Sequence, residues 1–332
     1  MPPSTLPTEA VGAGESIAPA PTPHVARDHL DARAVMLVVL LSACWGFTQV
    51  TVKFANSGFQ PVFQAGLRSA IACVLVYAWC RYRRISLFER DGTLWAGIVA
   101  GLLFGVEFML IYIGLDYTTV SRSVLFVYTM PFVVAIGAHF LIPAERLTVV
   151  KVIGMAAAFF GLVMAFSDRL SLPSQSALFG DLLCLLAAVA WGATTLVIKT
   201  TKLATASAEK VLLYQLVVSA VLLLPASLVF GPLIRDMTAL TVGAVVYQAV
   251  IVVAISYLVW FWLLRNYPAG DLSTFAFLTP VFGLLFGAML LSEPVGPRLI
   301  LALALVATGL YLVAYRRKPV ALKQLAGAGP PD

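Results

Sequence analysis

The sequence has 332 residues, of which 61% are hydrophobic and only 11% are Lys, Arg, Asp or Glu. A typical soluble domain is about 45–50% apolar and about 25% charged, so this composition excludes a conventional soluble enzyme. The formal net charge of +6 is spread over short segments between apolar runs, which excludes the concentrated basic patch of a nucleic-acid-binding protein.

The chain begins and ends with segments that contain no long apolar run. Residues 1–32 are rich in Pro, Ala, Thr and Ser, and residues 317–332 end in AGAGPPD. Such segments bury too little apolar surface to offset the entropy lost on ordering, so we predict two disordered tails. The first is not a signal peptide, because it lacks a charged start followed directly by an apolar core.

Ten apolar segments follow one another between these tails, and each is long enough for one helical membrane crossing. Only helices and closed barrels satisfy their backbone polar groups in lipid, and runs of this length exclude barrel strands. The sequence therefore predicts an all-α polytopic membrane protein with ten transmembrane helices. They are expected near residues 34–55, 62–80, 93–115, 119–141, 148–166, 178–199, 209–230, 239–263, 271–291 and 298–315.

The Lys and Arg residues are distributed unequally between the two sides of such a bundle. Most fall in the segments that share a side with the two termini, whereas the opposite side has only Arg122, Arg169, Arg235 and Arg298. Short loops rich in Lys and Arg stay in the cytoplasm. We therefore expect both termini to be cytoplasmic, in an inner (plasma) membrane of bacterial type.

The two halves of the sequence resemble each other. The segment WGFTQVTVK at residues 45–53 recurs as WGATTLVIK at residues 191–199, and further matches are Pro131 with Pro280, Glu145 with Glu293 and Gly161 with Gly309. Each half has five spans, so the second half enters the membrane from the opposite side. We predict two inverted five-helix repeats, residues 33–167 and 178–316. This arrangement is typical of secondary transporters, although a duplication that serves only stability would leave the same pattern.

Several motifs resemble a known family. They are Trp45-Gly46 with Lys53, the LRSAIA segment around Arg68, the TMPF and LTPV prolines, and the PAERLT and LSEPVG helix ends. Together they resemble EamA-type members of the drug/metabolite transporter superfamily. The resemblance implies a central cavity lined by helices 1–4 and 6–9, with helices 5 and 10 at the periphery, and it implies export. Pro294 in LSEPVG departs from the usual pattern of that helix end.

Two ionisable residues fall inside predicted spans. Ionisable groups within a membrane are costly and mark functional sites by default. Glu107, near the centre of the third span, could pair with a substrate amine, provide a route for proton coupling, or serve as a structural partner of Arg68. Arg68 in the second span suits a carboxylate or a phosphate, but it could also snorkel or pair with backbone carbonyls. Its repeat equivalent is Gln215.

Aromatic and polar side chains complete the predicted substrate site. Trp45, Gln49 and Lys53 share one helical face, and Trp191, Thr195 and Lys199 repeat it. We assign the two tryptophans and Gln49 to the cavity and the lysines to snorkelling anchors. Three tyrosines that we also place there are Tyr128, Tyr214 and Tyr257, whereas Tyr112, Trp262 and Tyr267 fit the aromatic belt at the membrane interface.

Pro131 and Pro280 lie inside predicted helices, where proline removes a backbone hydrogen bond. We expect them to act as hinges, the alternative being static kinks. Glu145 and Glu293 end the helices that contain these prolines, and each is expected to cap the next helix.

The sequence contains no pattern that requires a metal or a cofactor. Its four cysteines form no CxxC pair, and the only histidine in a span is His139, so catalysis in the membrane is poorly supported. A channel would favour a pore ring of identical groups. An aromatic site with few charges suits small amphipathic solutes. We therefore predict a secondary transporter, not an enzyme, that exports a neutral or aromatic amino acid across the lipid bilayer. The alternatives are a carrier of drugs or other metabolites and, with less support, a membrane-embedded enzyme.

Overall fold

The computed structural model describes residue 27 and residues 29–167, 174–291 and 297–314, except the side chains of a few helical residues, Gln49 among them. The tails predicted at the two termini therefore lie almost wholly outside the described residues, as do Glu293 and Pro294. The described chain is helical and contains no β-strand.

Most of the predicted spans form one continuous helix each. These helices are α1 (Ala32–Gly58), α2 (Pro61–Tyr82), α3 (Leu94–Tyr117), α6 (Val149–Phe166), α7 (Gln175–Thr200), α8 (Ala208–Ser227) and α13 (Pro297–Ala314). Hydroxyl or carboxylate side chains accept backbone N–H groups at several N-termini, for example Asp31 at α1 and Ser174 at α7, which satisfies donors that a helix start leaves free. Seven helical segments of the described chain are long and apolar enough to cross a membrane.

Three predicted spans are interrupted helices. Residues 119–141 form α4 (Val120–Val127) and α5 (Met130–Leu141). Residues 239–263 belong to α9 (Ala239–Tyr247), a π-helical segment η4 (Gln248–Ser256) and α10 (Tyr257–Asn266). Residues 271–291 belong to α11 (Ala269–Thr274), a 3₁₀ turn η5 (Phe275–Phe277) and α12 (Leu278–Leu291). Such interruptions are frequent at functional sites.

Both prolines lie at the beginning of a helix, so the expectation that they sit inside one was wrong. Pro131 is the second residue of α5 and Pro280 the third of α12. A proline cannot donate to the preceding turn and disfavours helical geometry at the residue before it, in agreement with the break at residues 128–129 before Pro131, whereas Thr279 before Pro280 is still helical. At the first break, the carbonyl oxygen of Phe126 accepts both the Thr129 hydroxyl at 2.6 Å and the Thr129 backbone N–H at 3.1 Å, which fixes the turn.

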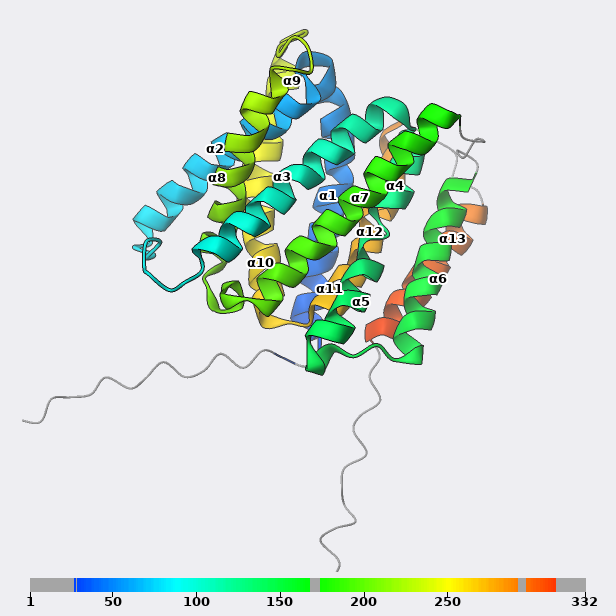
Figure 1. Ribbon diagram of the computed structural model, residues 1–332. Coiled ribbons are helices and arrows are strands. Elements are labelled where there is room, and N and C mark those ends of the chain that lie inside the picture. The colour runs from blue at the N-terminus through cyan, green and yellow to red at the C-terminus, as the bar shows by residue number, and fades with distance from the viewer. Residues whose placement is uncertain (1–26, 28, 168–173, 292–296, 315–332) are drawn as a thin grey trace, which may run out of the picture.

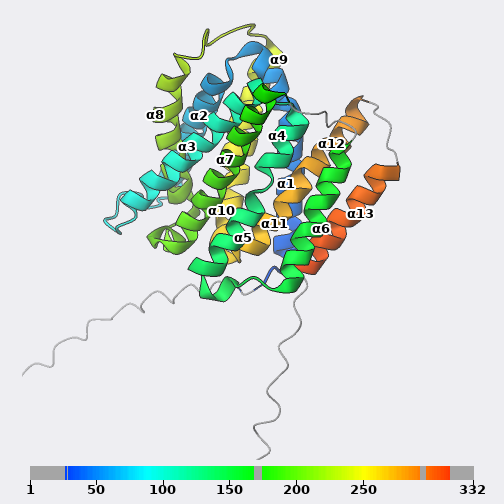
Figure 2. The same ribbon diagram turned by 45° about the vertical axis from the view of Figure 1, so that its right-hand side comes forward.

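Small residues allow the helices of the two halves to approach closely (Figures 1 and 2). A Cβ atom at Gly97 would lie 2.4 Å from the ring of Tyr214, and one at Gly101 would lie 2.6 Å from Val218, so α3 packs on α8 through its glycine face. This is the close packing expected where helix association in lipid depends on shape.

Helices α6 and α13 pack against each other at one edge of the bundle, on the right in Figure 1. A Cβ atom at Gly309 would lie 2.4 Å from the carbonyl oxygen of Gly154, and one at Gly154 would lie 2.7 Å from that of Gly309. The two backbones are therefore in direct contact.

The bundle has two ends. The basal end, as we name it, contains the start of α1 and residues 83–93, 142–148, 201–207 and 266–268. The distal end contains residues 59–60, 118–119 and 228–238. The basal segments contact one another, as where Lys210 Nζ donates to Asp91 Oδ2 at 2.7 Å, and at the distal end Thr118 donates to Asp181 at 2.7 Å.

Candidate functional site

A cavity of about 520 Å³ lies in the middle of the bundle, between helices of both halves. Its walls come mainly from α1, α3, α4, α7 and α10, with single residues of α2, α6, α8 and η4. The structure brings into it Trp45, Arg68, Glu107, Tyr128, Trp191, Gln215 and Tyr257, residues that the sequence separates by up to 212 positions.

The wall formed by α1 and α10 is an aromatic cluster. The indole N–H of Trp45 donates to the Ser256 hydroxyl at 2.8 Å, which fixes the ring. The edges of Tyr257 and Trp260 meet this ring in T-shaped contacts, with centroids 5.9 and 5.4 Å away. Such edge-to-face contacts hold rings in one orientation, so this wall is preformed.

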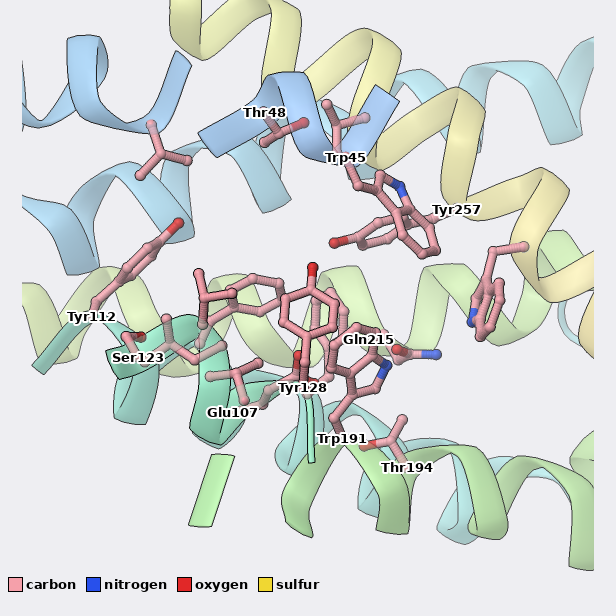
Figure 3. A pocket seen from close by; sticks show the side chains of 18 of the residues that line it. Trp45, Thr48, Glu107, Tyr112, Ser123, Tyr128, Trp191, Thr194, Gln215 and Tyr257 are labelled. Atoms are coloured by element: carbon pink, nitrogen blue, oxygen red, sulfur yellow. The ribbon is translucent and has the colours of Figure 1, made fainter. Parts of the chain in front are cut away.

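The opposite wall contains the repeat equivalent of Trp45. Trp191 on α7 makes a T-shaped contact with Tyr128 at 6.1 Å. Figure 3 shows Trp45, Thr48 and Tyr257 on one side of the cavity and Glu107, Tyr128, Trp191, Thr194 and Gln215 on the other. Tyr128 occupies the break between α4 and α5, so the interruption places its ring in the cavity.

The cavity contains one buried guanidinium and one buried carboxyl group. Arg68 is 3% exposed and Glu107 is 5% exposed. The Arg68 guanidinium lies 4.0 Å from the ring centroid of Phe108, a cation–π contact, and its Nε has no hydrogen-bond partner among the described residues. In the described part of the chain, neither group is within salt-bridge distance of an opposite charge.

Polar side chains near these charges have spare hydrogen-bonding capacity. The hydroxyls of Thr48, Thr194 and Thr195 donate to carbonyls one turn earlier in their own helices, so their oxygens remain acceptors. Gln215 is fully buried, and its Oε1 has no partner among the described residues. Buried polar atoms without a partner are costly, and a polar ligand would satisfy this one.

Two of the predicted site residues are not placed in the cavity. Tyr214 lies between α3 and α8, where its hydroxyl is 3.1 Å from the Thr93 hydroxyl and its ring packs on Gly97. The side chain of Gln49 is outside the part of the chain that the structure describes.

The face of α1 that lines the cavity differs from the face predicted from the sequence, which contained Gln49 and Lys53 beside Trp45. Trp45, Thr48, Val52 and Asn56 line the cavity, at spacings of three and four residues. The signal was in the repeat itself, because Thr48 matches Thr194, which also lines the cavity. The match of Thr48 with Thr194 therefore predicts that the Thr48 side of α1 faces the cavity.

Tyr112 lines the cavity and is 4% exposed, so its assignment to the membrane interface was wrong. Its ring lies 5.9 Å from the Arg68 guanidinium. Tyr267 is also buried, and its hydroxyl hydrogen-bonds Asp31. Both tyrosines follow long apolar runs, and the sequence alone does not separate a ring that faces lipid from one that faces protein.

Glu145 caps a helix, but not the helix that follows it. Its carboxylate accepts the backbone N–H groups of Ala269 at 3.0 Å and Gly270 at 2.9 Å, at the start of α11 in the other half. Helix α6, which follows Glu145, is capped by Thr148. His139 accepts the backbone N–H of Leu147 through Nδ1 at 3.1 Å, a contact that orders the same turn.

The sequence profile of the EamA-like transporter family matches this chain twice, over residues 32–167 and 178–315. An uncharacterized transporter of Bacillus subtilis, YoaV, is 28% identical over 86% of this chain and 99% of its own length. A probable amino-acid metabolite efflux pump of Escherichia coli is 24% identical over 83% of this chain and 93% of its own. A crystal structure of 19% sequence identity covers 85% of this chain with a TM-score of 0.74, which supports the fold.

The family profile matches each half of the chain once, in agreement with the internal repeat. The chain is thus a multi-pass membrane protein, and it belongs to the EamA-like transporter family.

Proposed function

We propose that this transporter carries a small amphipathic solute, a neutral or aromatic amino acid, by alternating access around the central cavity. The observation that carries the proposal is the pair of buried ionisable groups, Arg68 and Glu107, which line one aromatic cavity and form no ion pair with any residue that the structure describes. An amino acid has a carboxylate for the guanidinium and an ammonium group for the carboxylate. The aromatic walls suit an apolar side chain between them.

The packing of the helices supports ten spans in two inverted repeats, residues 33–167 and 178–316. Helix α1 contacts α9 and α12, and its repeat equivalent α7 contacts α3 and α5 in the same way. Helices α2 and α8 pack on each other, as do α6 and α13. This pattern of equivalent contacts supports a pseudo-two-fold relation between the halves, and inverted repeats of this kind are typical of alternating-access transporters.

We infer that the basal end faces the cytoplasm of a bacterial-type inner membrane. Most Lys and Arg residues fall in its segments or in the terminal tails, and such loops stay inside. The export direction is supported by the efflux-pump relative.

Pro131 and Pro280 are proposed hinges, because each follows a break in its span and the breaks are repeat equivalents. The first break is at Tyr128 and Thr129, and the second includes Phe277, 149 residues after Tyr128. Replacing both prolines with Ala should slow transport without changing substrate affinity. Unchanged transport would show that they are static kinks.

Proteoliposomes test the function with matched labelled solutes: L-phenylalanine, phenethylamine without the carboxylate, 3-phenylpropanoate without the amine, and L-leucine. Saturable, counter-exchangeable flux of the two amino acids, and little flux of the two truncated solutes, is the expected result. Preference for phenethylamine would favour a carrier of amines or cationic drugs. Absence of saturable flux for every solute would contradict the proposal.

Proton coupling through Glu107 is tested in the same vesicles. If this carboxyl group carries a proton, an imposed pH gradient should drive accumulation of L-phenylalanine, and Glu107→Gln should abolish the drive. Equal flux with and without the gradient would assign Glu107 to substrate binding alone.

A further inference from the structure

A second cavity of about 310 Å³ lies between the central cavity and the basal end. We call it the basal chamber. Ile198 of α7 and Phe261 of α10 line both cavities, and they are only 4% and 6% exposed. These two side chains therefore form the partition that a solute would have to pass between the basal end and the central cavity.

The basal chamber is lined by more positive than negative charge. Arg27, Lys199 and Arg265 face it, and Glu145 is the only acidic residue among its described lining residues. The Glu145 carboxylate is occupied by the two N–H groups at the start of α11. Its distance to Lys199 Nζ is 3.8 Å, so it compensates one of the cations.

Two of the cations have partners within the protein. Lys199 Nζ donates to the carbonyl oxygen of Tyr267 at 2.7 Å, and Arg27 forms an ion pair with Asp31. Both are therefore held in place by the α1 start and by the segment after α10. Their charges still contribute to the field in the chamber.

Arg265 differs from the other two. No residue of the described chain accepts a hydrogen bond from it or forms an ion pair with it, and its Nε is buried without a partner. A guanidinium has five donors in a planar fork that matches a carboxylate. A buried donor of this kind requires an acceptor, and the chamber is the space next to it.

We propose that the basal chamber is a loading site in which Arg265 binds the carboxylate of the solute before the partition at Ile198 and Phe261 opens. This inference rests on the proposed function, because it assigns the carboxylate to the transported molecule. The amino acid would then exchange Arg265 for Arg68 as it enters the central cavity. The two sites lie on opposite sides of the partition, so each needs its own cation.

The first experiment measures binding without transport. The variant Thr205→Cys introduces a thiol at an exposed position that lines the chamber, and the purified full chain is alkylated with a neutral maleimide; the wild-type chain corrects for its native cysteines. Benzoate should slow alkylation of the introduced thiol several-fold, whereas benzyl alcohol, which has no charge, should not.

The control variants assign the effect to one residue. Adding Arg265→Gln should abolish protection by benzoate, and adding Arg265→Lys should retain part of it. Arg146→Gln makes the same charge change at an exposed basal residue that does not line the chamber, and it should leave protection intact. Absence of protection, or protection that survives Arg265→Gln, would overturn the loading site while leaving the proposed function standing.

The second experiment links the chamber to one side of the membrane. Uptake of labelled L-phenylalanine is measured in inside-out and right-side-out vesicles from cells that express the full chain. Arg265→Gln should raise the half-saturation concentration about tenfold at the cytoplasmic face, as expected for loss of a charge-assisted hydrogen bond, and leave the outer face unchanged. An equal shift at both faces, or none, would contradict the loading site. Failure of the wild type to transport would contradict the proposed function, and the alkylation result would still decide on carboxylate binding.

Discussion

The central cavity and the basal end both contain buried charges, but their charges are arranged differently. In the cavity, Arg68 and Glu107 have no ion-pair partner in the described chain. At the basal end, acidic groups lie next to cations: Lys151 with Asp271, Lys199 with Glu145, and Lys210 with Asp91. The same types of side chain are therefore paired in one region and unpaired in the other.

The difference indicates what each region does. Buried charges are costly when they lack a partner, so a folded chain retains them where a ligand supplies the compensation. Paired charges join segments and need no ligand. Local departures from full pairing are expected at functional sites. Substitution of the unpaired groups, Arg68 and Glu107 in the cavity and Arg265 in the basal chamber, should thus affect transport, and substitution of the paired charges at the basal end should affect stability.

The largest effect is expected from removing the cavity charges. Arg68→Gln or Glu107→Gln should lower transport efficiency for L-phenylalanine about 10- to 100-fold, since a hydrogen bond to a charged group contributes about 1.5–3 kcal/mol. Neither variant loses an ion pair, so the thermal unfolding midpoint should stay unchanged for Glu107→Gln and fall only slightly for Arg68→Gln, which loses the cation–π contact with Phe108. Radiolabelled flux in proteoliposomes and unfolding of the purified variants provide the two measurements. A lower unfolding midpoint with normal flux in the remaining folded protein would show that Arg68 and Glu107 stabilise the fold and do not bind the solute.

The next effect concerns the Glu145 carboxylate. Glu145→Ala leaves the N–H groups of Ala269 and Gly270 without their acceptor, which should cost about 2–3 kcal/mol and lower the unfolding midpoint by several degrees. Glu145→Gln retains one acceptor oxygen and should lie in between. Thermal unfolding of the three chains in the same detergent decides the order. An alanine variant as stable as the wild type would show that this buried contact contributes nothing.

The repeat and the helices were predictable because they depend on local sequence. Long apolar runs gave the spans, and the recurrence of Trp45 at Trp191 gave two of the cavity walls. The same alignment of the two repeats pairs Arg68 with Gln215, and both residues line the cavity. Residues that stand out from an apolar background are the ones that sequence reasoning found.

The phase of each helix was harder to predict. In lipid, the outer face of a helix is as apolar as its packed face, so no polar stripe marks the side of α1 that contains Val52 and Asn56. The partner of Glu145 was missed for another reason. Ala269 and Gly270 act through backbone N–H groups 124 residues further along the chain, and no side-chain pattern identifies such donors.

The contact between α6 and α13 sharpens the comparison, because the glycines that form it, Gly154 and Gly309, have no charge and do not line the central cavity. At Gly309 an added methyl group would meet backbone atoms of Gly154 and Ala158 at 2.4 and 2.6 Å. Gly309→Ala should therefore separate α6 from α13 and destabilise the protein by about 1–2 kcal/mol, with little change in the half-saturation concentration for transport. Unfolding and flux are measured together.

Gly243→Ala is the matched control, since no atom lies within 4 Å of a Cβ atom there. It should be neutral or slightly stabilising because alanine favours a helix. Equal destabilisation by both substitutions would show that the contact of α6 with α13 is not the cause.

The smallest effect should come from the exposed edge of the basal end. Asp91 lies in the loop before α3, and its hydrogen bond from Lys210, together with those from the Thr93 hydroxyl and N–H, lowers its pKa below the ordinary value. A carboxylate whose pKa is lower in the folded state stabilises the fold above its unfolded pKa of about 4. That contribution is lost as the pH falls below this value.

The difference in unfolding midpoint between wild type and Asp91→Asn should therefore shrink between pH 6 and pH 3. Glu89→Gln in the same exposed loop is the control for removal of a negative charge at this end. If the difference for Asp91→Asn stayed constant across this range, the ionised Asp91 carboxylate would not contribute to stability. The ion pair of Lys210 with Asp91 would then not be one of the stabilising charge pairs of the basal end.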